Sequence, residues 1–227
     1  MRRTSWWRRH FLPLTPGVKW ILVVTVAVHV AMLVLLASSE AAFDAVFMHL
    51  ALVPANLLHL EVQGLVTMML LHDPGNMFHI LLNMLLLYSL GPAVEGRIGT
   101  MAFLKLYVVA GVCGSLAFSA WAFTFGDPTV PAIGASGAVL GVLAAFSLLF
   151  PHARLLIYFV APIKGAHLVW LALAIDAVVA FSDPSVAVSA HVGGIIGGFL
   201  FIRRPWRPAY RRQAAWRLAR LKGRVFR

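Results

Sequence analysis

A single cysteine and a shortage of acidic residues set the first limits on this chain of 227 residues. With Cys113 alone, the chain cannot form an internal disulfide or a multi-cysteine metal site, so neither can hold the fold together. There are 8 Asp and Glu against 19 Lys and Arg, and charged residues make up only 12% of the chain. So few charges cannot cover the surface of a soluble domain, which excludes that class of protein.

Apolar residues are abundant instead, at 61% of the chain, with a mean hydropathy of +0.86. A helix needs about 20 apolar residues to cross a hydrocarbon core of ~30 Å. The apolar runs therefore predict an all-α membrane protein, a six-transmembrane-helix bundle. The expected spans are roughly 19–37, 78–95, 101–123, 136–150, 166–182 and 188–202.

Positive charge is confined to four parts of the chain. These are residues 2–19, the turns at 97–105 and 154–164, and the tail from Arg203 onward. The other connections, which contain no Lys or Arg, are 38–77, 124–135 and 183–190. With six spans the two sets fall on opposite sides of the membrane, and the positive-inside rule places both termini in the cytoplasm. The net charge of +11 therefore indicates contact with a lipid bilayer and not with nucleic acid.

Three parts of the chain follow from this pattern: a cytoplasmic N-terminal segment (1–18), a six-helix membrane domain (19–202) and a basic cytoplasmic tail (203–227). The tail predicts either an amphipathic helix on anionic inner-leaflet lipids or a disordered segment. The run at 19–37 is longer than a signal-peptide core, which favours a retained span. The long connection 38–77 is itself apolar, so we expect a membrane-associated first loop.

Polar residues inside the spans are costly and are therefore functional candidates. His79 and Asn83 are four residues apart, which places them on one face of a helix. Ser136 and His191 each open a later span. At 1.5 Å per residue, Ser136, His79 and His191 lie about 21, 18 and 17–18 Å above the inner ends of their helices. The three side chains are thus expected at one depth, below a water-filled cavity.

Glycines are placed to bring two of these helices together. Gly137 and Gly141 form a small-xxx-small stripe after Ser136, and the last span carries two such stripes. The glycines of the last span are Gly193, Gly194, Gly197 and Gly198. If these faces meet, the backbones approach closely enough for Ser136 to reach His191.

A serine hydroxyl becomes a nucleophile when a base such as His191 takes its proton. The backbone N–H of Ser136, at a helix start, and the side chains of His79 and Asn83 are candidate donors to an oxyanion. Because no acid lies near His191 in the sequence, we predict a Ser–His dyad without a metal or organic cofactor. Asp176 lies at the depth of the site, where a third triad member is conceivable, but a neutral or hydrogen-bonded gate residue is the preferred interpretation.

The order of these motifs resembles the rhomboid family of intramembrane serine proteases. They are H-x-x-x-N at 79–83, G-x-S-G from Gly134 to Gly137 and A-H-x-G-G at 190–194, within a resemblance that covers roughly 45–202. The resemblance implies that Ser136 is the nucleophile and His191 the base, with His79, Asn83 and the Ser136 N–H as oxyanion donors.

The resemblance further implies that the substrate is a transmembrane helix of another protein, which enters laterally near the second and fifth spans. Glu95 and Arg97 match a family E-x-R pattern with a structural role, holding the inner turn and the long first loop. The sequence departs from the family in one respect. The first loop lacks the Trp–Arg pair that many members carry, which leaves the anchoring of this loop open.

The sequence thus predicts an intramembrane serine endopeptidase. The alternative is a catalytically silent rhomboid-like protein that binds membrane helices. A small transporter would explain buried polar residues but not the serine–histidine pairing, and no internal repeat is evident. We expect a multi-pass protein of a bacterial inner membrane, although the acid-free, Arg-containing residues 1–39 leave a mitochondrial origin open. The sequence specifies neither a particular substrate nor an oligomeric state.

Overall fold

The computed structural model describes residues 14–157, 161–182 and 187–203. The predicted basic tail after Arg203 and most of the predicted N-terminal segment therefore lie outside the described residues, so the tail helix stays a prediction.

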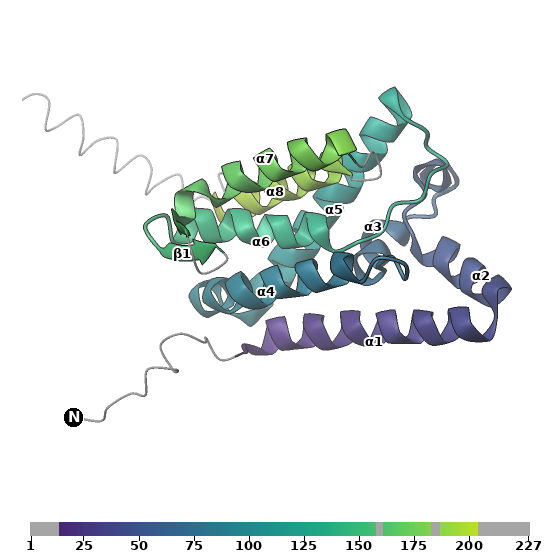
Figure 1. Ribbon diagram of the computed structural model, residues 1–227. Coiled ribbons are helices and arrows are strands. Elements are labelled where there is room, and N and C mark those ends of the chain that lie inside the picture. The colour runs from purple at the N-terminus through teal and green to yellow at the C-terminus, as the bar shows by residue number, and fades with distance from the viewer. Residues whose placement is uncertain (1–13, 158–160, 183–186, 204–227) are drawn as a thin grey trace, which may run out of the picture.

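Six apolar helices lie where the hydropathy pattern predicts spans (Figure 1). Three are long and apolar enough to cross a membrane: α1 (Pro16–Ser38), α4 (Met77–Ile98) and α5 (Thr100–Phe125). Three are shorter: α6 (Ser136–Leu149), α7 (Leu168–Ser182) and α8 (Val188–Arg203). Their bounds differ from the predicted ones by a few residues, so the predicted helical membrane bundle is confirmed.

Helix α6 lies at the centre of the bundle. Every residue from Gly137 to Ser147 is buried, and the helix packs against α4, α5 and α8 (Figure 1). By contrast, α1 lies along the outside of the bundle beside α4, and large side chains of α1 and α7 such as Trp20 and Val178 are exposed. A membrane supplies apolar surroundings for such side chains.

The first loop is built from short helices, which are α2 (Glu40–Leu50), η2 (Pro54–His59), α3 (Gly64–Thr67) and η3 (Met68–Leu70). Backbone hydrogen bonds join it to the connection that precedes α6. Leu52 and Ala132 exchange two of them, with N···O distances of 3.0 and 2.8 Å, and the Gly134 N–H donates to the Met68 carbonyl at 3.0 Å. Main-chain pairing thus holds this loop in a sequence that lacks the Trp–Arg pair.

A two-stranded hairpin replaces the plain inner loop predicted between α6 and α7. Strand β1 (Arg154–Ile157) pairs antiparallel with β2 (Ala161–Lys164). This short hairpin is a local addition to a fold whose described residues are otherwise helical or in loops, so the predicted all-α bundle holds; a connection too short for a span has room for two strands of four residues each.

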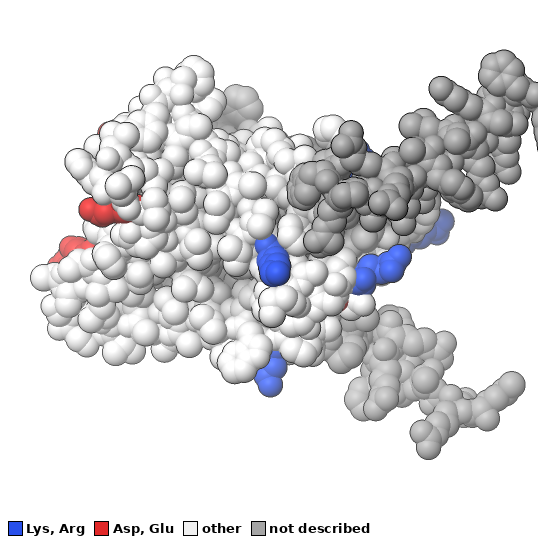
Figure 2. Space-filling view, turned by 180° about the vertical axis from the view of Figure 1, so that it is seen from behind, with Lys and Arg blue, Asp and Glu red and all other residues white. Residues whose placement is uncertain are grey.

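Charged side chains are separated along the bundle. On the face seen in Figure 2, most Lys and Arg lie toward one end of the molecule, while Asp and Glu are seen toward the opposite end. This is the pattern expected of a multi-pass membrane protein whose basic connections share one side.

Glu95, near the end of α4, links this helix to the starts of α1 and α5. Glu95 is 2% exposed, and its carboxylate accepts hydrogen bonds from the N–H groups of Gly17 and Val18, both at 2.9 Å, in the first turn of α1. The hydroxyls of Thr15 and Thr100 donate to it at 2.5 and 2.6 Å. Glu95 therefore serves as the N-terminal cap of α1, whose own N-cap side chain makes no capping bond to its helix.

The contacts of Glu95 and Arg97 differ in detail from those expected of the E-x-R pattern. Arg97 is exposed, and the donors to Glu95 come from the start of α1 and from Thr100, not from the first loop. Glu95 fits the expected structural role at the inner turn, whereas the predicted role of Arg97 stays a prediction.

Replacing Glu95 with glutamine is expected to lower the stability of the bundle by about 2–4 kcal/mol, because an amide has one acceptor oxygen and leaves buried donors unpaired. The measurement is thermal unfolding in detergent micelles. Glu61→Gln is the matched control, since Glu61 is exposed and accepts one bond from Asn56 at 3.2 Å. Equal melting temperatures for the two variants would contradict the capping role.

Candidate active site

Ser136 is the first residue of α6 and follows a turn-rich connection. The N–H groups in the first turn of a helix have no carbonyl partner within the helix, and they carry the positive end of its dipole. The backbone N–H of Ser136 is one of these groups, so the side chain and a potential oxyanion donor come from the same residue.

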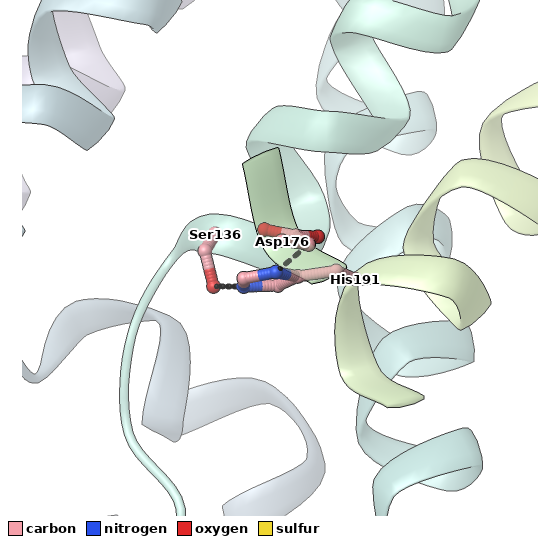
Figure 3. A network of polar contacts seen from close by, with 3 residues as sticks. All are labelled: Ser136, Asp176 and His191. Carbon is pink, nitrogen blue, oxygen red and sulfur yellow. Dashed lines mark hydrogen bonds and ion pairs between the residues drawn. The ribbon is translucent and has the colours of Figure 1, made fainter. Parts of the chain in front are cut away.

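His191 lies in the first turn of α8, and its side chain points toward Ser136 at the start of the neighbouring helix α6 (Figure 3). Its Nε2 atom is 2.7 Å from Oγ of Ser136, a distance at which the hydroxyl can donate its proton to the ring. The structure thus brings together the two residues that the sequence singles out as nucleophile and base.

Glycine contacts make this approach possible. A methyl group added to Gly194 would lie 2.0 Å from the carbonyl oxygen of Gly137, and one added to Gly198 would lie 2.3 Å from that of Gly141. The same addition to Gly141 would meet Cβ of Ala110 at 2.2 Å. The backbones of α6 and α8 are therefore in direct contact, and α5 closes on α6 at the same level.

Asp176 of α7 is the residue that the sequence prediction did not assign to the site. Its Oδ2 atom lies 2.8 Å from Nδ1 of His191, and both side chains are 13% exposed (Figure 3). Ser136, His191 and Asp176 thus form a continuous chain of two hydrogen bonds. This arrangement differs from the predicted two-residue dyad. The depth of Asp176 was the available signal, but the sequence does not show the direction in which α7 turns this side chain.

His79 and Ser136 face the same space beside Gly134. A methyl group on Gly134 would lie 2.7 Å from Nε2 of His79 and 3.8 Å from Oγ of Ser136. Gly134 also has φ of +118°, a conformation that side-chain-bearing residues rarely adopt. Glycine at this position therefore allows both the turn into α6 and the close approach of the His79 ring.

Asn83 is buried one turn below His79, but its side-chain amide is engaged elsewhere. Nδ2 donates to the carbonyl of His79 at 2.9 Å and lies 3.4 Å from Nε2 of His72. These contacts do not include Ser136, so an oxyanion role for Asn83 stays a prediction.

His72 and His29 extend the polar cluster away from Ser136. The ring of His72 packs edge-on against His79 and His29, with centroid distances of 5.0 and 6.4 Å. Burial, together with the neighbouring rings of His79 and His29, lowers the pKa of His72 to about 3. His72 is therefore neutral near pH 7, and a neutral ring can accept a hydrogen bond from Asn83.

The fold is that of a helical membrane protein, and its site contains a serine, a histidine and an aspartate joined by two hydrogen bonds. The sequence model of the Rhomboid domain matches residues 59–206, a range that contains Ser136, Asp176 and His191. The chain therefore belongs to the rhomboid family.

Similar proteins come from yeast, bacteria and plants. The chain is 38% identical to "Rhomboid protein 1, mitochondrial" of Saccharomyces cerevisiae over 133 residues, which cover 55% of this chain and 37% of that protein. It is 36% identical to "Rhomboid protease GluP" of Bacillus subtilis over 121 residues, 53% of this chain and 22% of that one. With "RHOMBOID-like protein 7" of Arabidopsis thaliana it shares 31% identity over 142 residues, 62% of this chain and 42% of the other. The chain thus spans less than half the length of these relatives.

Proposed function

We propose that this protein is an intramembrane serine endopeptidase that hydrolyses peptide bonds in or next to the transmembrane helices of other membrane proteins. The observation that carries the proposal is the distance of 2.7 Å between Oγ of Ser136 and Nε2 of His191, at the meeting point of two helix starts. Membership of the rhomboid family supports it.

In the proposed reaction, Ser136 attacks the peptide carbonyl while His191 takes the hydroxyl proton at Nε2. The carbonyl π electrons move to the oxygen and form an oxyanion. When this intermediate collapses, the C–N bond breaks and the proton on Nε2 passes to the leaving amine. Water, activated by the same imidazole, then releases the acyl group and restores the serine hydroxyl.

Three donors are proposed for the oxyanion: the Ser136 backbone N–H, His79 and Asn83. The N–H is held by the start of α6, and Nε2 of His79 lies beside Gly134. The amide of Asn83 would have to turn from the His79 carbonyl toward the substrate. Its donation therefore belongs to the bound state, in which hydrogen bonds at a site often tighten.

The proposed substrate is the transmembrane helix of another protein, admitted sideways near α4 and α7. Both helices have exposed apolar side chains, among them Phe78, Leu82, Trp170 and Val178. We place both termini in the cytoplasm, with the basic tail near anionic inner-leaflet lipids. A bacterial inner membrane is the proposed location, and a mitochondrial membrane is the alternative. We propose no nucleic-acid partner and no metal or organic cofactor.

A catalytically silent membrane-helix-binding protein is the second candidate. Such a protein would need neither a paired nucleophile and base nor a donor beside them. The contact between Ser136 and His191 and the position of His79 beside Gly134 favour the enzyme.

A fluorophosphonate probe tests the proposed function directly, because it phosphonylates an activated serine with loss of fluoride. We expect the purified protein in detergent to be labelled at Ser136 and at no other serine, as read by mass spectrometry of its peptides. Ser147→Ala is the matched control, since Ser147 lies in the same helix and donates to the Leu143 carbonyl at 3.0 Å. That variant should be labelled like the wild type, and a folded but unlabelled wild type would favour the silent protein.

A further inference from the structure

The proposed function uses one nitrogen of His191, but both ring nitrogens have partners. Nε2 lies 2.7 Å from the Ser136 hydroxyl, and Nδ1 lies 2.8 Å from the Asp176 carboxyl (Figure 3). We propose that Asp176 is a positioning residue that holds His191 in the tautomer and orientation required of a base. This inference rests on the proposed function and deepens it, by replacing the predicted Ser–His dyad with a three-residue arrangement.

The tautomer argument follows from the donors and acceptors. An ionised carboxylate can only accept hydrogen bonds, so the contact with Asp176 requires a proton on Nδ1 of His191. A neutral ring with its proton on Nδ1 has a lone pair on Nε2, and this lone pair faces the Ser136 hydroxyl. Asp176 thereby prevents the other tautomer, in which Nε2–H would point at Ser136 and could not take its proton.

Asp176 neither gains nor loses a proton during the proposed reaction. As Ser136 attacks, its proton moves to Nε2, and His191 becomes an imidazolium that still donates from Nδ1 to the carboxylate. When the intermediate collapses, the proton on Nε2 leaves with the amine, and the neutral ring returns. Asp176 keeps its negative charge throughout and stabilises the imidazolium through a short charge-assisted bond.

The surroundings strengthen this effect. Both Asp176 and His191 are 13% exposed at the side chain, so little water competes for Nδ1. An ionisable group among membrane helices is costly unless it is paired, and His191 is the partner that the structure provides. The sequence alone favours a neutral or hydrogen-bonded gate residue at this position, whereas the contact with His191 gives the carboxylate a partner within the site.

The third residue comes from a different part of the bundle than the other two. Glycine contacts between α6 and α8 hold Ser136 near His191, whereas α7 brings Asp176 from the periphery, where Trp170 and Val178 are exposed. The chain of hydrogen bonds is therefore complete only while α7 is packed against α8.

Two substitutions of Asp176 separate positioning from structure. In Asp176→Asn the side-chain amide can donate to Nδ1, which forces the proton onto Nε2 and blocks the base. In Asp176→Ala the ring of His191 is free to adopt either tautomer. We expect kcat for cleavage of a transmembrane substrate to fall by about 10³- to 10⁴-fold in Asp176→Asn and by less in Asp176→Ala, with KM nearly unchanged in both.

The control is Asp44→Asn, which makes the same chemical change at an exposed residue of α2 and should retain the wild-type kcat. A second measurement is the ¹⁵N–¹H correlation of the His191 ring, whose Nδ1 proton should be seen in the wild type and lost in Asp176→Asn. A merely structural carboxylate would instead lower the melting temperature of both variants equally and leave the tautomer unchanged, which overturns the inference. If the wild type cleaves and Asp176→Asn cleaves equally well, this inference alone fails; if the wild type neither cleaves nor reacts with the probe, the proposed function fails first.

Discussion

Replacing Ser136 with alanine is expected to lower the rate of transmembrane-substrate cleavage by about 10⁶-fold, as the loss of a nucleophile does in serine proteases of other folds. The remaining groups can still bind and polarise a peptide carbonyl, but no atom is left to form the acyl bond. The measurement is cleavage of a transmembrane substrate by purified protein in detergent or liposomes, with the products resolved by mass spectrometry.

His191→Ala should be similarly inactive, and the double variant should be no worse than either single one, because the two residues act as a unit. Ser147→Ala provides the control for a serine of the same helix that is held by its own backbone. Equal cleavage by the wild type and Ser136→Ala would trace the activity to a contaminating protease and remove the basis of the proposed function.

The spans and the meeting of Ser136 with His191 could be predicted because both depend on one-dimensional properties. Hydropathy sets where a helix crosses the membrane, and the rise per residue sets the depth of a side chain along it. The depth of each residue along its helix therefore predicts that His79, Ser136 and His191 lie at one level, and the glycine spacing indicates which helices can touch.

Rotation and main-chain pairing could not be predicted in the same way. Asp176 lies at the right depth, but whether it faces His191 or the lipid depends on how α7 is turned, and hydropathy does not show this in a helix that is apolar nearly all round. The first loop is held by backbone hydrogen bonds such as those between Leu52 and Ala132, which leave no mark on side-chain identity. The hairpin at β1 and β2 is likewise too short for a clear alternation.

The Glu95 contacts illustrate a further limit. A short E-x-R pattern indicates a structural carboxylate, but its partners are backbone N–H groups of Gly17 and Val18, some 77 residues away. Nothing in those two residues marks them as donors, because any residue other than proline at the start of a helix presents the same group. A structural role for Glu95 could therefore be predicted from the sequence, but its hydrogen-bond partners could be identified only from the folded structure.

Replacing Gly194 with alanine is expected to abolish cleavage by forcing α6 and α8 apart. The new methyl group would lie 2.0 Å from the oxygen and 2.6 Å from the carbonyl carbon of Gly137, and a backbone cannot turn aside as a side chain can. Overpacking typically costs about 1–3 kcal/mol, and a clash with backbone atoms lies at the upper end of this range. A displacement of about 1 Å between Ser136 and His191 can lower the rate by a further 10²-fold. Melting temperature and fluorophosphonate labelling measure the two effects separately.

Gly96→Ala is the matched control, because Gly96 also lies in a helix but, outside its own stretch of helix, no atom of the described residues lies within 4 Å of an added methyl group. Alanine is the better helix former by up to about 1 kcal/mol, so this variant should be as stable as the wild type or more so, and fully labelled. If Gly194→Ala melted and reacted like Gly96→Ala, close contact between α6 and α8 could not be what holds the serine beside the histidine. Loss of labelling in Gly194→Ala at a temperature where the protein is still folded would support the opposite conclusion. The glycine contact that packs α6 against α8 would then also set the distance over which the proton moves from Ser136 to His191.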